Sequence, residues 1–319
     1  MARYYHHETV QMHGTNDDIR SNVRRGLAIT TASNYRPERS MPPPSAIAFG
    51  PSQRGRSSSS SSIAGKKRLS SQIGAALPPS KRFYSASPTK ASGDAISNRV
   101  HRRVILCDYG KPIYKAGSRL AFFAALEGCI EGHESLHKAG LLHRDISINN
   151  LLINEDGNNP SWPSFLIDLD LAVRKRRKCP SGAKGKTGTR AFMAIGALFG
   201  KQHSFMHDLE LFFWVLFWIC VHYDGPDKSR VVPEFDQWNY ISMELLAKEK
   251  KGQVSYERDF IKSAEDNFTP HYQPLIPWVN RLRKAVFPNG GRWEKEEIGL
   301  YARMREIIGE ARRDPKVSA

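Results

Sequence analysis

Residues 141–153 read LLHRDISINNLLI and decide the fold, because they place charged side chains between two apolar stretches. Asp145 comes first, and Asn150 follows it by five residues. Residues 165–170, FLIDLD, repeat the pattern with Asp168 directly behind a second apolar stretch. The Asp-, Gly-, Asn- and Pro-rich residues between the two stretches favour a turn, so we expect a β-hairpin. Each polar site then lies at the end of a short strand, and the two sites converge on one spot.

Helical patterns surround this hairpin. Apolar spacing over 118–139 predicts a helix with Ser118 as N-cap and Gly140 as stop. Residues 205–223 are apolar nearly all round, which is typical of a helix at the centre of a core. Val104–Leu106 is predicted to be a short buried strand. Further helical segments are expected at 236–250, 256–266, 273–286 and 294–312.

The order of these motifs resembles the large lobe of the protein kinases, and most closely the fungal-type protein kinase family. The resemblance covers roughly residues 100–310. It implies an α+β fold whose mainly helical C-terminal lobe, 101–312, carries short β-hairpins. The stretches that carry it are CDYGKPI, GCIEGHESLHKAGLLHRDISINNLLIN, FLIDLDLA, GKTGTRAFMAIGAL and HSFMHDLELFFWVLFWIC.

The resemblance implies a site for ATP and Mg²⁺. Phosphoryl transfer needs a carboxylate that accepts the proton of the substrate hydroxyl, and Asp145 matches that position. Asn150 and Asp168 match the two magnesium ligands, whose oxygen atoms suit this ion. Asp108, in the CDYGKPI stretch, is assigned to cofactor binding on the same basis.

Other family roles concern the protein substrate and the support of the loop. Thr189 matches a threonine that contacts the catalytic aspartate in Ser/Thr kinases. Arg144 would pair with a phosphorylated residue, for which Thr187 and Ser181 are the candidates. His143 is expected to brace the loop, and Asp208 to hold its backbone.

The sequence departs from the kinase pattern at three places. Ser147 replaces the lysine that follows the catalytic aspartate by two residues, which leaves the acceptor type open between Ser/Thr and Tyr. Residues 168–170 are Asp-Leu-Asp and lack the usual glycine. Gly196 replaces the glutamate that ends the activation segment, so Arg281 or Arg283 is a candidate for its orphaned partner.

No glycine-rich loop and no lysine followed by a helical glutamate precede the lobe, so we expect the small lobe to be absent from this chain. Three interpretations remain open. They are a shortened Ser/Thr-type protein kinase, a non-catalytic kinase-like lobe that binds partners, and a phosphotransferase for small molecules. The Gly-Thr segment and the long basic loop argue against the third. The isolated chain is expected to bind Mg²⁺-ATP weakly and to transfer phosphate negligibly.

The formal charge of +16 is concentrated in two regions. Residues 1–100 hold 15 Lys and Arg against 5 Asp and Glu, and residues 171–190 hold 8 basic residues and no acid. The first region is rich in Ser and Pro and is predicted to be mostly disordered, with Leu27–Thr30 and Ala46–Phe49 as weak strand candidates. Its basic pairs between Lys66 and Arg82 fit a bipartite nuclear signal. In the second region, Lys175–Lys178 either favours an acidic protein or peptide substrate or is simply a solvated surface. Residues 313–319 are expected to be a C-terminal tail.

Four scattered cysteines indicate reduced thiols in an intracellular protein, nuclear or cytoplasmic. The most apolar stretch, 211–221, is too short for a bilayer span, which needs about 20 residues. His203 and His207 have a metal-compatible spacing, but no Cys or acid completes a Zn²⁺ site, so capping or packing is predicted. No motif of a nucleic-acid-binding fold accompanies the charge.

Overall fold

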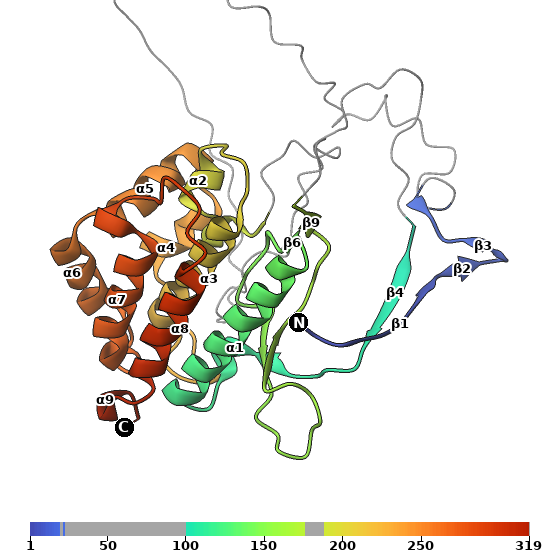
Figure 1. Cartoon of the computed structure of the whole chain (residues 1–319), viewed down its shortest axis with the longest axis horizontal. Helices are drawn as coiled ribbons and strands as arrows, with labels where there is room; N and C mark the ends of the chain where they lie inside the picture. Colours follow the sequence, from blue (N-terminus) through green and yellow to red (C-terminus); the bar gives the residue numbers. More distant parts are fainter. Residues whose placement is uncertain (20–21, 23–99, 176–187, 319) are drawn as a thin grey trace, which may run out of the picture.

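The computed structural model describes residues 1–19, 22, 100–175 and 188–318. The helices gather in one body, and a two-stranded ribbon extends from its side (Figure 1). The helices are α1 (Arg119–Lys138), α2 (Ile195–Leu198), α3 (Phe205–His222), α4 (Pro233–Asp236), α5 (Met243–Ser255), α6 (Glu257–Asn267), α7 (Ile276–Val286), α8 (Leu300–Ala311) and α9 (Pro315–Ser318). The strands are β1 (Tyr4–Thr9), β2 (Gln11–Met12), β3 (Thr15–Asn16), β4 (Arg102–Leu106), β5 (Lys111–Pro112), β6 (Leu141–Leu142), β7 (Leu151–Ile153), β8 (Ser164–Leu166) and β9 (Val173–Arg174). Short 3₁₀ turns are η3 (Ile113–Lys115), η4 (Arg190–Phe192), η5 (Gln237–Asn239), η6 (Gln273–Leu275) and η7 (Pro288–Gly290).

Helix α3 forms the centre of the helical body, as its apolar sequence predicts. Its side chains are buried along almost the whole helix, and α1 and α7 pack against it. Among the described residues, α3 is the one helix long and apolar enough to cross a membrane, and 89% of it is buried inside the protein. That burial is typical of a core helix. Because α3 is surrounded by other elements, apolar residues are found on every face of it.

Helix α1 and the hairpin behind it confirm two predictions. Ser118 caps α1, because its hydroxyl accepts a hydrogen bond from the backbone N–H of Ala121 at 3.1 Å. The helix stops before Gly140, which takes a φ of +80° that favours glycine. Strands β7 and β8 pair in antiparallel fashion, and β5 joins the outer side of β7. This small sheet lies against α1 and fixes the two loops that follow its strands.

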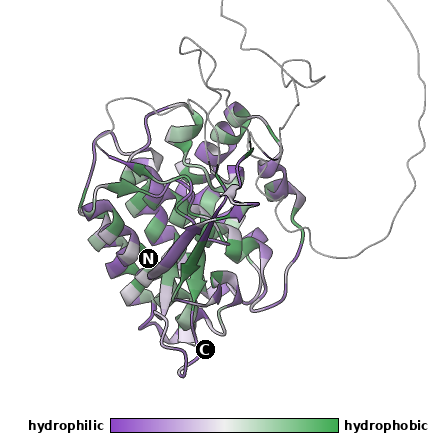
Figure 2. Cartoon of the chain, turned by 90° about the vertical axis from the view of Figure 1, so that its right-hand side faces the viewer, coloured by the Kyte–Doolittle hydropathy of each residue, from purple (hydrophilic) through white to green (hydrophobic). Residues whose placement is uncertain are grey.

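The ribbon of β1 and β4 corrects two predictions. Strand β4 was expected to be buried, yet all its residues are exposed, because β1 is its only strand partner among the described residues. Figure 2 shows the hydrophobic half of β4 uncovered next to the hydrophilic β1. Residues 4–16, expected to belong to a disordered tail, instead form β1, β2 and β3. The strand candidates and basic pairs between residues 27 and 82 lie outside the described residues.

The C-terminal helices follow the predicted order with shifted ends. The segment predicted at 236–250 is divided into α4, η5 and α5, and the segment predicted at 294–312 begins only with α8. The two middle segments correspond to α6 and α7. The expected C-terminal tail forms α9, where Val317 is buried and its carbonyl accepts a hydrogen bond from Arg119 Nε at 3.0 Å. The folded body therefore continues beyond residue 312.

Candidate active site

The loop that joins β6 to β7 is held by one buried carboxylate, Asp208, near the start of α3. Asp208 Oδ2 accepts the backbone N–H of His143 and Oδ1 accepts that of Arg144, both at 2.9 Å. Two imidazoles also bond to this carboxylate, His133 Nε2 at 2.9 Å and His203 Nε2 at 2.7 Å. Asp208 was predicted to hold the loop backbone, and its geometry does so.

These partners stabilise the ionised form of Asp208. Burial alone would raise the pKa of this carboxyl, but His203 and the hydrogen bonds from His133 and His203 outweigh it and hold the pKa well below its usual value. His133 is itself oriented by the Tyr301 hydroxyl, which lies 2.8 Å from His133 Nδ1. The anchor of the loop thus reaches from α3 to α1 and α8. Sequence reasoning missed His133, which looks like an ordinary member of the apolar face of α1.

Asp145 meets Thr189 at the centre of the loop. Asp145 Oδ1 accepts two hydrogen bonds from Thr189, from the backbone N–H at 2.9 Å and from the hydroxyl at 3.0 Å. Asp145 itself is 1% exposed. Gly188, just before Thr189, has a φ of +111°, and a side chain there would come within 2.9 Å of the Arg144 carbonyl oxygen. The two segments can therefore approach only because residue 188 is glycine.

Asn150 and Asp168 are brought to the same edge by the β7–β8 hairpin. The backbone N–H of Ile167, next to Asp168, donates to the Asn150 carbonyl oxygen at 3.1 Å. Asn150 Nδ2 donates to the Asp145 carbonyl oxygen at 2.7 Å, which leaves its Oδ1 as the acceptor end of the amide. The convergence expected from the strand ends is therefore present for Asp145, Asn150 and Asp168.

His143 connects the two loops of this arrangement through contacts of its ring nitrogens with their backbones. Its Nε2 lies 3.0 Å from the Ile167 carbonyl oxygen, and its Nδ1 lies 3.4 Å from the backbone N–H of Asp145. Since Nδ1 faces a donor, Nε2 carries the proton and donates to Ile167. Burial lowers the pKa of His143, which favours this neutral form. Both nitrogens face backbone groups, so His143 links the Asp145 loop to the Asp168 loop.

Two non-glycine residues of the site have left-handed backbone conformations. Arg144 has a φ of +70° and Asp168 has a φ of +65°. Such conformations cost about 1–3 kcal/mol and are concentrated at active sites. Asp170 takes the place of the usual glycine without a positive φ, so the lost glycine is accommodated in this conformation.

One of the predicted site residues, Asp108, is not part of this cluster. The Arg3 guanidinium donates two hydrogen bonds to Asp108 Oδ1, from Nη2 at 2.7 Å and from Nε at 3.0 Å. Asp108 also accepts a hydrogen bond from the backbone N–H of Trp162. Asp108 therefore anchors the start of the chain rather than facing Asp145 and Asn150. Thr187 and Ser181 lie outside the described residues.

Comparison with known proteins agrees with this geometry. A model of the family described as fungal protein kinase matches residues 1–220. This chain belongs to the fungal protein kinase family. The match starts at residue 1 rather than near residue 100, which agrees with the strands found at the start of the chain.

Two curated kinases share shorter stretches with this fungal-type chain. A probable serine/threonine-protein kinase of Dictyostelium discoideum is 30% identical over 149 residues, which are 46% of this chain and 9% of that protein. The rhodopsin kinase of Rattus norvegicus is 35% identical over 79 residues, which are 25% of this chain and 13% of that protein. The matched stretches therefore span a small part of either relative.

The segment after Thr189 is fastened by a buried acid and a buried lysine that sequence reasoning missed. Glu210 Oε1 accepts the backbone N–H of Ile195 at 2.7 Å and the indole N–H of Trp214 at 2.9 Å. Lys250 Nζ donates to the Met193 carbonyl oxygen at 2.8 Å and lies 4.4 Å from the centre of the Trp214 ring. Burial raises the pKa of Glu210 and lowers that of Lys250, and the opposite charge of each partner offsets part of this.

Gly196 explains why this family member has no glutamate at that position. A Cβ on Gly196 would lie 2.2 Å from His207 Nε2, so no larger residue fits there. His207 forms a capping box with Ser204, and His203 bonds to Asp208, so the two histidines cap and pack as predicted. Arg283 is not orphaned, because its Nη1 donates to the Val254 carbonyl oxygen at 2.6 Å. Arg281, the other candidate, pairs with Glu310.

Proposed function

We propose that this chain carries the catalytic loop of an ATP-dependent protein kinase that phosphorylates Ser or Thr, with Asp145 as the general base. The observation that carries the proposal is the double hydrogen bond from Thr189 to Asp145 Oδ1. It links the catalytic loop to the segment on which a protein substrate would lie. A carboxylate held in this way can accept the proton of a substrate hydroxyl as phosphoryl transfer proceeds.

The donor set supports magnesium as the ion that carries the nucleotide. Asn150 offers an amide oxygen, and Asp168 offers a carboxylate at the end of the neighbouring strand. Magnesium prefers oxygen ligands and commonly takes one or two from protein while phosphates and water supply the rest. Among the described residues, no group of three His, Cys, Asp or Glu side chains is placed to hold a metal ion. In this proposal the ion neutralises charge on the phosphates.

A second function, a non-catalytic kinase-like lobe that binds partners, is favoured by Ser147. This residue is buried and offers only a hydroxyl where Ser/Thr kinases have a lysine that contacts the transferred phosphate. Loss of that cation would lower transition-state stabilisation and leave binding less affected. The two functions therefore differ in transfer rather than in nucleotide binding.

The proposal is tested by measuring nucleotide binding and transfer on the same preparations. We expect millimolar Mg²⁺-ATP to raise the melting temperature of the wild-type chain, and Asp168→Asn to remove this shift. Radiolabelled ATP is then offered with matched Ser, Thr and Tyr peptides at high chain concentration, and only trace transfer, to Ser or Thr, is expected from a chain predicted to transfer phosphate negligibly. Magnesium-dependent binding with no transfer would favour the non-catalytic lobe, and transfer to Tyr alone would contradict the assignment to Ser or Thr.

A further inference from the structure

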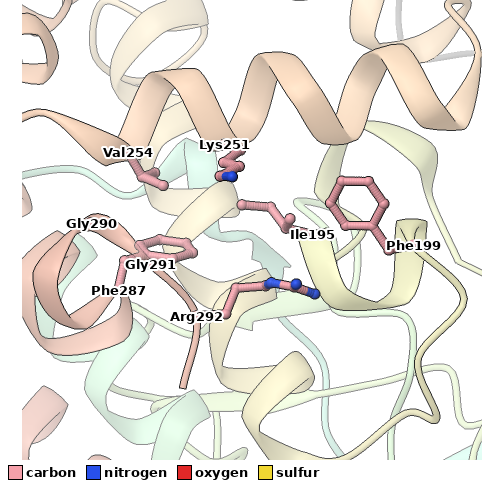
Figure 3. Close-up of a pocket in the computed structure, with 8 residues that line it drawn as sticks. All are labelled: Ile195, Phe199, Lys251, Val254, Phe287, Gly290, Gly291 and Arg292. Carbon is pink, nitrogen blue, oxygen red and sulfur yellow. The ribbon is translucent and has the colours of Figure 1, made fainter. Parts of the chain in front are cut away.

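A cavity of about 260 Å³ is lined in part by α2, which follows Thr189 along the chain (Figure 3). Ile195 lines it from α2 and Val254 from α5, while Phe199 and Phe287 line it from the positions just after α2 and α7. Two charged residues, Lys251 and Arg292, stand among these apolar walls. Figure 3 shows the Arg292 side chain below Ile195, with its guanidinium pointing to the side of the cavity where Phe199 lies. Among the described residues, none of those that line the cavity is acidic.

Two residues that line the cavity, Lys251 and Arg292, are cations. Both are exposed, and within the described part of the chain neither forms a salt bridge. The guanidinium of Arg292 lies 5.3 Å from the centre of the Phe199 ring, and that ring is itself 47% exposed. The nearest acid, Glu210, accepts the Ile195 N–H and feels the charge of Arg292, but it is buried, whereas both cations are exposed. An apolar cavity with exposed cations is complementary to a group with an apolar body and a negative end.

The size of the cavity limits the ligand. Pockets for drug-sized molecules have volumes of about 300–1,000 Å³, so this cavity suits one large side chain rather than a cofactor. A peptide that inserts one apolar side chain as an anchor commonly derives most of its affinity from that residue. Acidic neighbours of the anchor would then face Lys251 and Arg292.

A short, hydrogen-bonded segment of backbone joins the cavity wall to Thr189, which contacts the catalytic loop. Ile195 follows Thr189 by six residues, which an extended chain spans in at most about 20 Å. The backbone between them is fixed by Lys250 at Met193 and by Glu210 at Ile195. A substrate segment anchored in the cavity would therefore stay within about six residues of the acceptor held at Asp145.

We propose that this cavity is a docking site for an acidic segment of the protein substrate, which inserts one Phe- or Leu-sized side chain and directs flanking carboxylates to Lys251 and Arg292. The inference rests on the proposed kinase function and adds a substrate feature remote from the acceptor.

The backbone offers a variant that fills the cavity without strain. Gly291 has a φ of −118°, and a Cβ there would meet only the Pro288 carbonyl oxygen, at 3.6 Å. Gly291→Leu therefore adds an apolar side chain at the cavity wall. Gly290 is unsuitable, because its φ is +71° and a Cβ would lie 2.1 Å from the Ser255 carbonyl oxygen. Gly157→Leu, at an open turn, is the matched control for size.

Charge is tested separately from shape. Arg292→Ala removes one cation at the cavity mouth. Arg258→Ala is its matched control, since Arg258 is exposed on α6, has no ion pair and does not line the cavity. All four variants are compared with the wild-type chain by circular dichroism and urea unfolding. Native-like folding is expected for each, and binding is then compared at equal folded concentration.

Binding is measured by fluorescence anisotropy with a labelled peptide in which one Phe stands among Glu residues. Its acceptor position, six residues away, holds Ala, so no transfer is needed for the signal. We expect Gly291→Leu and Arg292→Ala each to raise the Kd about tenfold, and both controls to change it by less than about twofold. A peptide with Gln in place of Glu should bind weakly to every variant.

Other outcomes would overturn the inference in distinguishable ways. Unchanged peptide binding by Gly291→Leu would exclude the cavity as the docking site. A concentration-dependent dimer in sedimentation that Gly291→Leu abolishes would assign the cavity to a second copy of the chain instead. Cavity-dependent binding without any transfer to Ser peptides would contradict the kinase function and leave the binding site standing. Transfer that is equal for acidic and neutral peptides would contradict the docking site alone.

Discussion

Removing the Glu210 carboxylate tests how the segment after Thr189 is fastened to the helical body. Glu210→Ala leaves the N–H of Ile195 and the indole N–H of Trp214 without an acceptor in a buried site. Each unsatisfied buried donor costs about 1–3 kcal/mol, and breaking a buried charge pair costs about 3–5 kcal/mol. We therefore expect Glu210→Ala to lower the free energy of unfolding by about 3–5 kcal/mol, a large part of the stability of a typical domain.

The matched variants separate the acceptor from the charge. Glu210→Gln keeps an oxygen that can accept both hydrogen bonds, while Lys250→Met removes the opposite charge and one hydrogen bond to Met193. We expect each single change to cost about 1–3 kcal/mol, and the double variant to cost less than their sum by more than about 0.5 kcal/mol. The reason is that removing both charges leaves no uncompensated charge in the interior.

Urea unfolding monitored by tryptophan fluorescence measures these costs, and amide hydrogen exchange at Ile195 reports the local bond. Exchange at Ile195 should accelerate in Glu210→Ala and stay slow in Glu210→Gln. Equal costs for Ala and Gln at residue 210 would refute the acceptor role. Additive costs within about 0.5 kcal/mol for Glu210→Gln and Lys250→Met would refute the coupling between the two charges.

Three further predictions concern the same segment. Gly196→Ala should destabilise the chain by about 1–3 kcal/mol because its Cβ would clash with His207, and His207→Ala should rescue it in thermal unfolding. Burial lowers the pKa of His207 to about 4, so the unfolded chain binds more protons between pH 4 and 6.5, and stability should rise across that window by about 3 kcal/mol. His207→Ala should flatten that rise in urea unfolding at stepped pH, and an unchanged slope would contradict the assignment. Thr189→Val should slow transfer by about 10- to 100-fold while Thr189→Ser keeps it, because a hydrogen bond to a charged group is worth about 1.5–3 kcal/mol.

The sequence predicts the parts of this structure that depend on local pattern. The spacing of Asp145, Asn150 and Asp168 around two apolar stretches correctly predicts the hairpin and the convergence of its ends. Ser118 and Gly140 mark the ends of α1, because capping chemistry is local. The central position of α3 follows from its apolar composition alone.

Contacts between distant segments could not be predicted in this way. Strand β1 pairs with β4 across roughly a hundred residues of chain, and nothing in Tyr4–Thr9 alone identifies its partner. Strand β4 looked buried because Val104, Ile105 and Leu106 are apolar, yet whether a strand is covered depends on the elements around it. Asp108 was assigned to the cofactor for its motif, and only the fold brings Arg3 to it.

The buried polar network around the site was predicted in part. Asp208 was identified from its place in the motif order, whereas His133, Glu210 and Lys250 were not. A sequence signal did exist for Glu210, since a carboxylate inside an otherwise apolar helix must find buried donors. Its partner Trp214 lies one turn along the same helix, whereas its partner Ile195 becomes evident only from the packing of α2 on α3.

The most direct test of the central claim is the rate of phosphate transfer by Asp145→Asn. Asn keeps the shape of the side chain and an oxygen facing Thr189, but it cannot accept a proton from a substrate hydroxyl. At saturating Mg²⁺-ATP, with Ser and Thr peptides, we predict that the slow transfer by the wild-type chain falls by at least about 100-fold in Asp145→Asn, while the nucleotide-dependent thermal shift is retained. Transfer by Asp145→Asn at the wild-type rate would contradict the role of this loop as the catalytic centre.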